Sequence, residues 1–301
     1  MADKHPSKSS EDVPRISLRD FLDPWNKWVV VPNGSWKGYF DWLPEKLRVG
    51  PWSPMAPIFL VTYVATIIYT KPQPTIQFDY ELTRLFPEAH SAYWYYNLIG
   101  FLWTLFILHT SLKEMSPTIF LSYTYQSWTA ICIRHGISAA APFLPSSYHM
   151  LFQIHEILRF HCLVTATVTF TLWNFAIMPV IYFKGCNTDI KKKKFIKFFF
   201  GFNLVQAHLL NIVYAILNTI ISSPRRFIVT DLWCSMATLL AYTLFYLLFM
   251  DRIGVHFYPV FSPRAHWCIL TYSACVGCYV ATYFGWNKLI SKFIVTSAIA
   301  S

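Results

Sequence analysis

The chain has 301 residues, of which 55% are hydrophobic, 19% aromatic and only 13% charged, and its mean hydropathy is +0.38. Soluble domains carry roughly a quarter charged residues, so this composition excludes an ordinary soluble protein and indicates an integral membrane protein. The formal charge of +10 comes mostly from Lys and Arg in the N-terminal region and in short loops between apolar runs. That placement is typical of membrane flanks and argues against a nucleic-acid-binding surface.

Four segments follow from the distribution of polar and apolar residues. We expect a polar and aromatic N-terminal extension (1–54), a marginal membrane segment with a loop (55–92), a membrane domain of six helices (93–288) and a C-terminal tail (289–301). The apolar run Ala56–Thr70 is short for the roughly 20 residues that span a hydrocarbon layer. The predicted fold is therefore an all-α, multi-pass transmembrane bundle of six core helices with a possible additional N-terminal membrane segment.

Six apolar runs are long enough to form the core helices, because backbone groups in lipid must be hydrogen-bonded within the segment itself. The expected helices are Tyr93–Ser111, Thr118–Ala141, Ile157–Phe183, Lys197–Ile221, Phe227–Met250 and Trp267–Trp286.

The run Lys191–Lys194 predicts that the loop after the third core helix is cytosolic. The side on which the termini lie depends on whether Ala56–Thr70 spans. We expect a multi-pass protein of the endoplasmic reticulum or the plasma membrane, and the sequence leaves its oligomeric state open.

The polar side chains near the third core helix do not have metal-site spacing. His155 and His161 are six residues apart and do not share a helical face, and the single C-x-x-C motif in YSACVGCYV has no second pair to complete a zinc site. The sequence predicts neither a metal nor a cofactor. For Glu156 and Arg159 we expect an ion-paired helix end at the membrane interface.

His208 is the most informative residue, because it lies in the middle of the apolar stretch FFFGFNLVQAHLLNIVYAILNTII, residues 198–221. An ionisable side chain inside a membrane span is costly to insert and indicates a functional site. Asn211 lies three residues on, on the same helical face. Either His208 is a core histidine that hydrogen-bonds Asn211 or a neighbouring helix, or it is a general base beside a nucleophile.

A second pattern links His208 to later residues. Tyr242 lies in the next span, and the segment LAYTLFYLLFMDRIGVHFYP continues to Gly254 and then to Tyr258-Pro259. With His208, this pattern resembles the family of androgen-induced-gene and androgen-dependent TFPI-regulating proteins. The resemblance covers about residues 93–286 and is most specific over 203–259.

The resemblance implies a membrane-embedded threonine hydrolase that cleaves fatty acid esters of hydroxy fatty acids, with a threonine on an early helix and a histidine on a later one. His208 matches the histidine. The family pattern of Phe-Leu-Thr departs here to FLSYTYQSWTAICI, so Thr124 is the best match and Ser122 and Thr129 are alternative nucleophiles.

The depth of the two residues in their helices can be compared directly. Thr124 is seven residues from Pro117, about 10 Å along a helix axis, and His208 lies eight to eleven residues beyond its lysine flank, roughly 12–17 Å. Regular hairpins make these two helices parallel, so the depths agree. Ser122 would lie shallower and on another face, whereas Thr129 would lie deeper.

These observations predict a lipid ester hydrolase in which Thr124 attacks the ester carbonyl and His208 accepts its proton. Asn211 would orient the imidazole or stabilise the oxyanion, and Tyr242 and Asn174 would line the substrate site. The partner is a membrane lipid that enters laterally between helices.

Two other functions share some of these features. An acyltransferase that moves acyl chains between lipids would use the same histidine with a different acceptor. A transporter or receptor would be non-enzymatic, but the spans lack the paired helices broken by Gly or Pro that secondary transporters commonly have.

Overall fold

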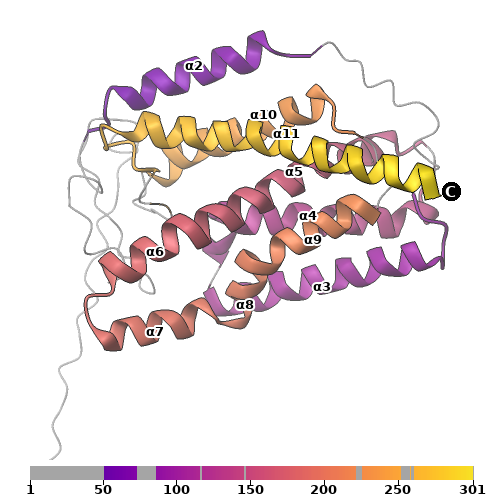
Figure 1. Ribbon diagram of the computed structural model, residues 1–301, viewed down its shortest axis with the longest axis horizontal. Coiled ribbons are helices and arrows are strands. Elements are labelled where there is room, and N and C mark those ends of the chain that lie inside the picture. The colour runs from indigo at the N-terminus through magenta and orange to yellow at the C-terminus, as the bar shows by residue number, and fades with distance from the viewer. Residues whose placement is uncertain are drawn as a thin grey trace, which may run out of the picture.

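The computed structural model describes residues 51–72, 86–115, 117–145, 147–221, 226–251, 258 and 261–300. These residues form helices and connections and contain no strand. The expected N-terminal extension lies almost entirely outside them. Figure 1 shows that the long helices lie side by side with their axes roughly parallel, as in a bundle.

Within the described residues, the α-helices of eleven or more residues are α2 (Met55–Tyr69), α3 (Ala92–Met115), α4 (Tyr123–Ala140), α5 (His149–Leu172), α7 (Asp189–Phe199), α9 (Asn211–Ile221), α10 (Val229–Phe245) and α11 (Cys268–Ala300). Shorter helices are α6 (Met178–Val180) and α8 (Phe202–Val205), with 3₁₀ turns η3 (Pro117–Leu121) and η4 (Ala141–Phe143). Four π-helical turns continue neighbouring helices: η5 (Trp173–Ile177), η6 (Ile181–Gly185), η7 (Gln206–Leu210) and η8 (Tyr246–Met250).

Within the described residues, four continuous helical segments are long and apolar enough to cross a membrane: His149–Gly185, Phe202–Ile221, Val229–Met250 and Cys268–Lys292. Their outer surfaces carry exposed apolar side chains such as Phe175, Val213, Leu270 and Phe284. Exposing this much apolar surface to water is unfavourable, whereas the hydrocarbon of a lipid bilayer can cover it. The protein is therefore a candidate multi-pass helical membrane protein.

The expected spans Tyr93–Ser111 and Thr118–Ala141, which correspond to α3 and α4, are not among these four. For α4 the reason is physical, because this helix lies inside the bundle and buries polar side chains, among them Ser127, Arg134 and Ser138. Interior helices tolerate such groups because other helices, not lipid, surround them. The polar content that lowers the hydropathy of α4 therefore reflects its central position.

The expected helix boundaries are corrected in several places. The predicted run Thr118–Ala141 is interrupted, because η3 ends at Leu121 and Ser122 caps a new helix, α4. Helix α5 begins at His149, earlier than expected, and the predicted start at Lys197 belongs to the separate helix α7, which ends before Gly201.

At the C-terminal end, α11 continues from Cys268 to Ala300, through the segment expected as a tail. The helix is therefore much longer than the span predicted from Trp267 to Trp286.

Helix α2 packs along the bundle although it has only 15 residues. The Tyr63 hydroxyl donates to the backbone oxygen of Met236 on α10 at 2.7 Å, and the indole of Trp233 donates to the oxygen of Ile67 at 2.9 Å. At the other end, Trp52 Nε1 donates to Asp251 at 2.8 Å. Helix α2 is thus hydrogen-bonded to α10 in its second half and held near its start through Trp52, and Figure 1 shows it along one side of the bundle.

The start of α2 and the lysine-rich helix α7 lie at the same end of the bundle. Tyr258 packs both against the apolar cluster that contains Met250 and Ala56 and against the cluster that contains Phe195 and Phe199 of α7. We refer to this end as the lysine end.

Helix α4 contacts η7 and α9, which continue one another, in a regular register. Thr124 meets His208, Ser127 meets Asn211, and Arg134 meets the backbone oxygen of Asn218. Each of the three contacts joins residues 84 positions apart, so the two helices run in the same direction. The parallel arrangement expected from regular hairpins is confirmed.

Candidate functional site

Thr124 lies in the first turn of α4, two residues after the N-cap Ser122. The Ser122 hydroxyl accepts a hydrogen bond from Tyr125 N at 3.3 Å, which satisfies one of the backbone donors that every helix start leaves without an intrahelical partner. The Thr124 side chain is only 4% exposed. The sequence placed Thr124 inside a longer helix, whereas the structure places it at a helix N-terminus.

His208 lies within the π-helical turn η7 and faces Thr124. The distance from Thr124 Oγ1 to His208 Nε2 is 3.4 Å, and both side chains are buried. The other ring nitrogen, Nδ1, lies 3.2 Å from the backbone oxygen of Leu204. A carbonyl oxygen only accepts, so Nδ1 carries the proton and Nε2 of the neutral ring is an acceptor for the Thr124 hydroxyl. This is the tautomer that a general base requires.

Two residues of the π-helical turn η5 also hold His208. The Trp173 indole stacks on the imidazole with ring centroids 4.0 Å apart. Asn174 Nδ2 donates to the backbone oxygen of His208 at 3.2 Å. π-helical turns occur frequently at functional sites, and here two of them, η5 and η7, meet at the histidine.

A cavity of about 80 Å³ lies against Thr124. Side chains from α2, α5, α10 and α11 form most of its wall, and nearly all of them are apolar or aromatic, including Phe59, Leu172, Leu239 and Val276. Such a cavity suits an apolar ligand with a few polar groups that fix its orientation. Thr124 therefore places a hydroxyl at the wall of an apolar space.

The remaining predicted residues have distinct surroundings. The Thr129 hydroxyl donates to the backbone oxygen of Tyr125 at 2.7 Å and makes no contact with His208, while Ser122 is engaged as the helix cap. Tyr242 lines the cavity and donates to Leu121 O at 3.1 Å. Among the three hydroxyls proposed as nucleophiles, the structure brings only Thr124 to the histidine.

Asn211 has a different contact from the one predicted. Its Nδ2 donates to Ser127 Oγ at 3.3 Å, and Ser127 lies 2.8 Å from Thr165 Oγ1. The backbone oxygen of Leu204, and not Asn211, holds the ring of His208. The π-helical turn that brings this oxygen to Nδ1 leaves no signature in the residue pattern, so sequence reasoning missed it.

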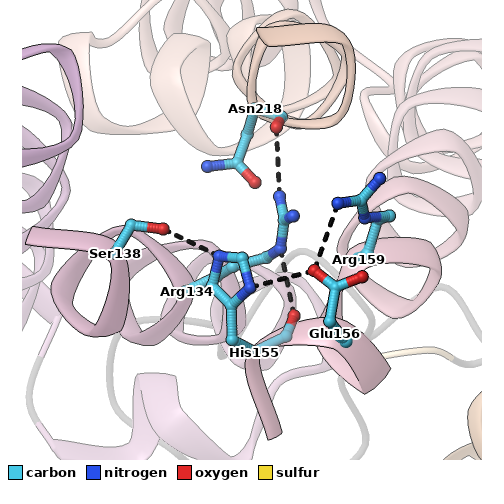
Figure 2. Close-up of polar contacts among 6 residues, drawn as sticks. All are labelled: Arg134, Ser138, His155, Glu156, Arg159 and Asn218. Carbon is cyan, nitrogen blue, oxygen red and sulfur yellow. Dashed lines mark hydrogen bonds and ion pairs between the residues drawn. The ribbon is translucent and has the colours of Figure 1, made fainter. Parts of the chain in front are cut away.

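A second polar cluster lies at the opposite end of α4 (Figure 2). Glu156 Oε1 contacts Arg159 Nη2 and His155 Nδ1, each at 3.1 Å, and His155 Nε2 lies 2.7 Å from Ser138 Oγ. Arg134 donates to the backbone oxygens of His155 and Asn218. We call these six residues, Arg134, Ser138, His155, Glu156, Arg159 and Asn218, the ionic cluster.

The ionic cluster corrects one expectation from the sequence. The ion pair of Glu156 with Arg159 forms, but both side chains are at most 4% exposed, so it is buried in the bundle and is not an interfacial helix end. Arg134 was not among the predicted residues. Arg134 lies on α4 and joins α4 to α5 and α9 through its hydrogen bonds to the backbone oxygens of His155 and Asn218, contacts that depend on how the three helices pack.

Across the residues that the structure describes, no group of three or more His, Cys, Asp or Glu side chains could hold a metal ion. Comparisons with protein-family models, with curated proteins and with solved structures found no match to this chain.

Proposed function

We propose that this protein is a membrane-embedded hydrolase of lipid esters, with Thr124 as the nucleophile and His208 as the general base. The observation that carries the proposal is the 3.4 Å contact from Thr124 Oγ1 to His208 Nε2 beside an apolar cavity. Such contacts are often long without substrate and tighten in the complex. The family resemblance in the sequence is consistent with the same chemistry.

The reaction would proceed in two steps. Thr124 Oγ attacks the ester carbonyl carbon as His208 Nε2 takes its proton, and collapse of the intermediate releases the alcohol, which receives that proton. A water molecule then attacks the acyl-threonine with His208 again as base, the carboxylic acid leaves, and the proton returns to Thr124 Oγ. Leu204 O stabilises the imidazolium through Nδ1 in both steps.

The apolar cavity indicates the substrate class. Because its wall is apolar apart from a few groups, an acyl chain can occupy it while the ester carbonyl lies at Thr124. Lipid-facing helices on its margin would allow an amphipathic ester to enter from the bilayer.

The test is hydrolysis of a fluorogenic long-chain fatty acid ester by the protein purified in detergent. Thr124→Ala and His208→Ala should lower the rate by about 10³-fold or more, because nucleophile and base act as a unit. Thr124→Ser should retain activity, since it keeps the hydroxyl.

Thr129→Ala is the matched control, because it removes a threonine hydroxyl of the same helix that does not face His208. Full activity in Thr124→Ala or His208→Ala would contradict the proposal. Product analysis with an added lysolipid distinguishes hydrolysis from acyl transfer, which would yield a new ester in place of the free acid.

A further inference from the structure

The proposed reaction places a negative charge on the carbonyl oxygen, and the structure contains donors that could receive it. Thr124 is in the first turn of the 18-residue helix α4. Backbone N–H groups of a first turn lack intrahelical partners, and the helix dipole adds a partial positive charge there. An oxyanion at Thr124 would thus form at the favourable end of a helix.

Tyr258 meets this helix end from the connection between η8 and α11. The backbone N–H of Thr124 donates to the Tyr258 hydroxyl oxygen at 3.4 Å, and Tyr258 also lines the cavity. The Tyr246 hydroxyl donates to the backbone oxygen of Tyr258 at 3.3 Å and fixes its position. A phenol both donates and accepts hydrogen bonds, and the side chains of Thr124 and Ser122 are further hydrogen-bond partners of this hydroxyl. A charged oxyanion at Thr124 would be a stronger acceptor for the Tyr258 O–H than either neutral hydroxyl.

The phenol of Tyr258 remains protonated under ordinary conditions. Burial raises the pKa of Tyr258 above its usual value of 10.0. The hydroxyl is therefore a neutral donor that can stabilise an anion without itself becoming charged.

Two further polar groups in the same cavity wall indicate an acceptor on the ligand. Trp173 Nε1 and Thr169 Oγ1 are buried, their side chains being 7% and 4% exposed, and neither has a hydrogen-bond partner in the described part of the chain. Leaving a buried donor without a partner is unfavourable, because the group loses its hydrogen bond to water. An occupant with an ester oxygen would satisfy these groups, whereas a hydrocarbon would not.

We infer that Tyr258 is a catalytic residue: its hydroxyl, together with the backbone N–H groups at the start of α4, forms the oxyanion hole for an ester carbonyl attacked by Thr124. When Thr124 Oγ bonds to the carbonyl carbon, the π electron pair moves to the carbonyl oxygen. That oxygen then displaces the Tyr258 oxygen as acceptor for Thr124 N–H, and the Tyr258 O–H donates to it. The inference rests on the proposed hydrolase function.

The first experiment compares Tyr258→Phe with the wild type in detergent, on the fluorogenic long-chain ester. Loss of one oxyanion donor should lower kcat by about 10²-fold and leave KM within a few-fold, because the hydroxyl acts in the transition state. The matched control is Tyr283→Phe, which removes a buried tyrosine hydroxyl bonded to Phe227 O, away from the cavity. Tyr283→Phe should retain the wild-type kcat.

The second experiment replaces the carbonyl oxygen of the substrate by sulfur. A thionoester accepts hydrogen bonds poorly, so the wild type should hydrolyse it at least 10²-fold more slowly than the ester, and Tyr258→Phe should discriminate less between the two. This measurement needs only the wild type if the variant does not fold.

The outcomes separate the two proposals. A wild-type kcat in Tyr258→Phe, or equal wild-type rates on ester and thionoester, would overturn the oxyanion assignment while Thr124→Ala remains inactive. Absence of ester hydrolysis by the wild type would instead overturn the hydrolase function itself.

Discussion

The two ends of α4 each place a hydroxyl beside a histidine, yet they differ in what surrounds the pair. Ser138 Oγ lies 2.7 Å from His155 Nε2, and the other ring nitrogen of His155 contacts the Glu156 carboxylate. Thr124 Oγ1 lies 3.4 Å from His208 Nε2, and the other ring nitrogen of His208 contacts a backbone oxygen. By contact geometry alone the ionic cluster is closer to a catalytic triad.

Access for a ligand favours the pair of Thr124 and His208 instead. Thr124 lines the apolar cavity, and none of the residues that line it belongs to the ionic cluster. Glu156 is also bound to Arg159, one turn further along α5, so its charge is engaged within that helix. A hydroxyl and an imidazole in contact can form a reactive site only where a substrate reaches them, and in the ionic cluster we expect them to stabilise the fold.

Glu156→Ala should have the largest effect on stability. Removing one partner of a buried ion pair leaves Arg159 without this carboxylate and costs about 3–5 kcal/mol, so the apparent melting temperature in detergent should fall sharply. The control is Glu88→Ala, because Glu88 is exposed. Equal melting temperatures for the Glu156 and Glu88 variants would show that the ionic cluster does not stabilise the bundle.

Gly100→Ala should have an intermediate effect. A Cβ at Gly100 on α3 would lie 2.8 Å from the ring of His135, which cannot move freely because Asn97 and Asn218 hydrogen-bond it. Overpacking of this kind costs about 1–3 kcal/mol. The control, Gly277→Ala on α11, meets no atom within 4 Å and should gain up to about 1 kcal/mol from helix propensity.

Equal melting temperatures for Gly100→Ala and Gly277→Ala would contradict the close packing of Gly100 against His135. Neither variant changes a residue of the cavity wall, so both should keep the ester hydrolysis rate per folded molecule.

Ser138→Ala should have the smallest effect and separates the two hydroxyls most directly. It removes a hydrogen bond to His155 and should cost about 1 kcal/mol of stability, with unchanged hydrolysis. Labelling by a fluorophosphonate probe, mapped by mass spectrometry, should remain at Thr124. Loss of activity or of labelling in Ser138→Ala would move the nucleophile to the ionic cluster.

The sequence singled out His208, since an ionisable residue in an apolar span is conspicuous. The pairing of His208 with Thr124 came from the resemblance noted in the sequence, and the direction and approximate depth of the helices agreed with it. The choice of His208 and the comparison of depths both depend on hydrophobic patterning, which the bilayer or a helical core imposes on every span.

Contacts between segments that are distant in the sequence could not be predicted from the hydrophobic pattern. The junction at Ser122 lies within a nearly continuous apolar run, so the break before α4 left no clear mark. The position of Arg134 between α5 and α9 depends on side-chain packing across three helices. Tyr258 was noted in the sequence as part of a pattern, but its contact with Thr124 depends on how the connection before α11 folds back.

The π-helical turn at His208 has a consequence for the phase of the helix. Helices α4 and α9 keep step at a constant separation of 84 residues, although η7 spaces its hydrogen bonds one residue wider than an α-helix. One residue corresponds to about 100° of rotation. Deletion of Leu209 or Leu210, which lie between His208 and Asn211, would therefore rotate the imidazole away from Thr124 while Asn211 and Asn218 kept their partners. The proposed chemistry thus depends on one residue of helical winding.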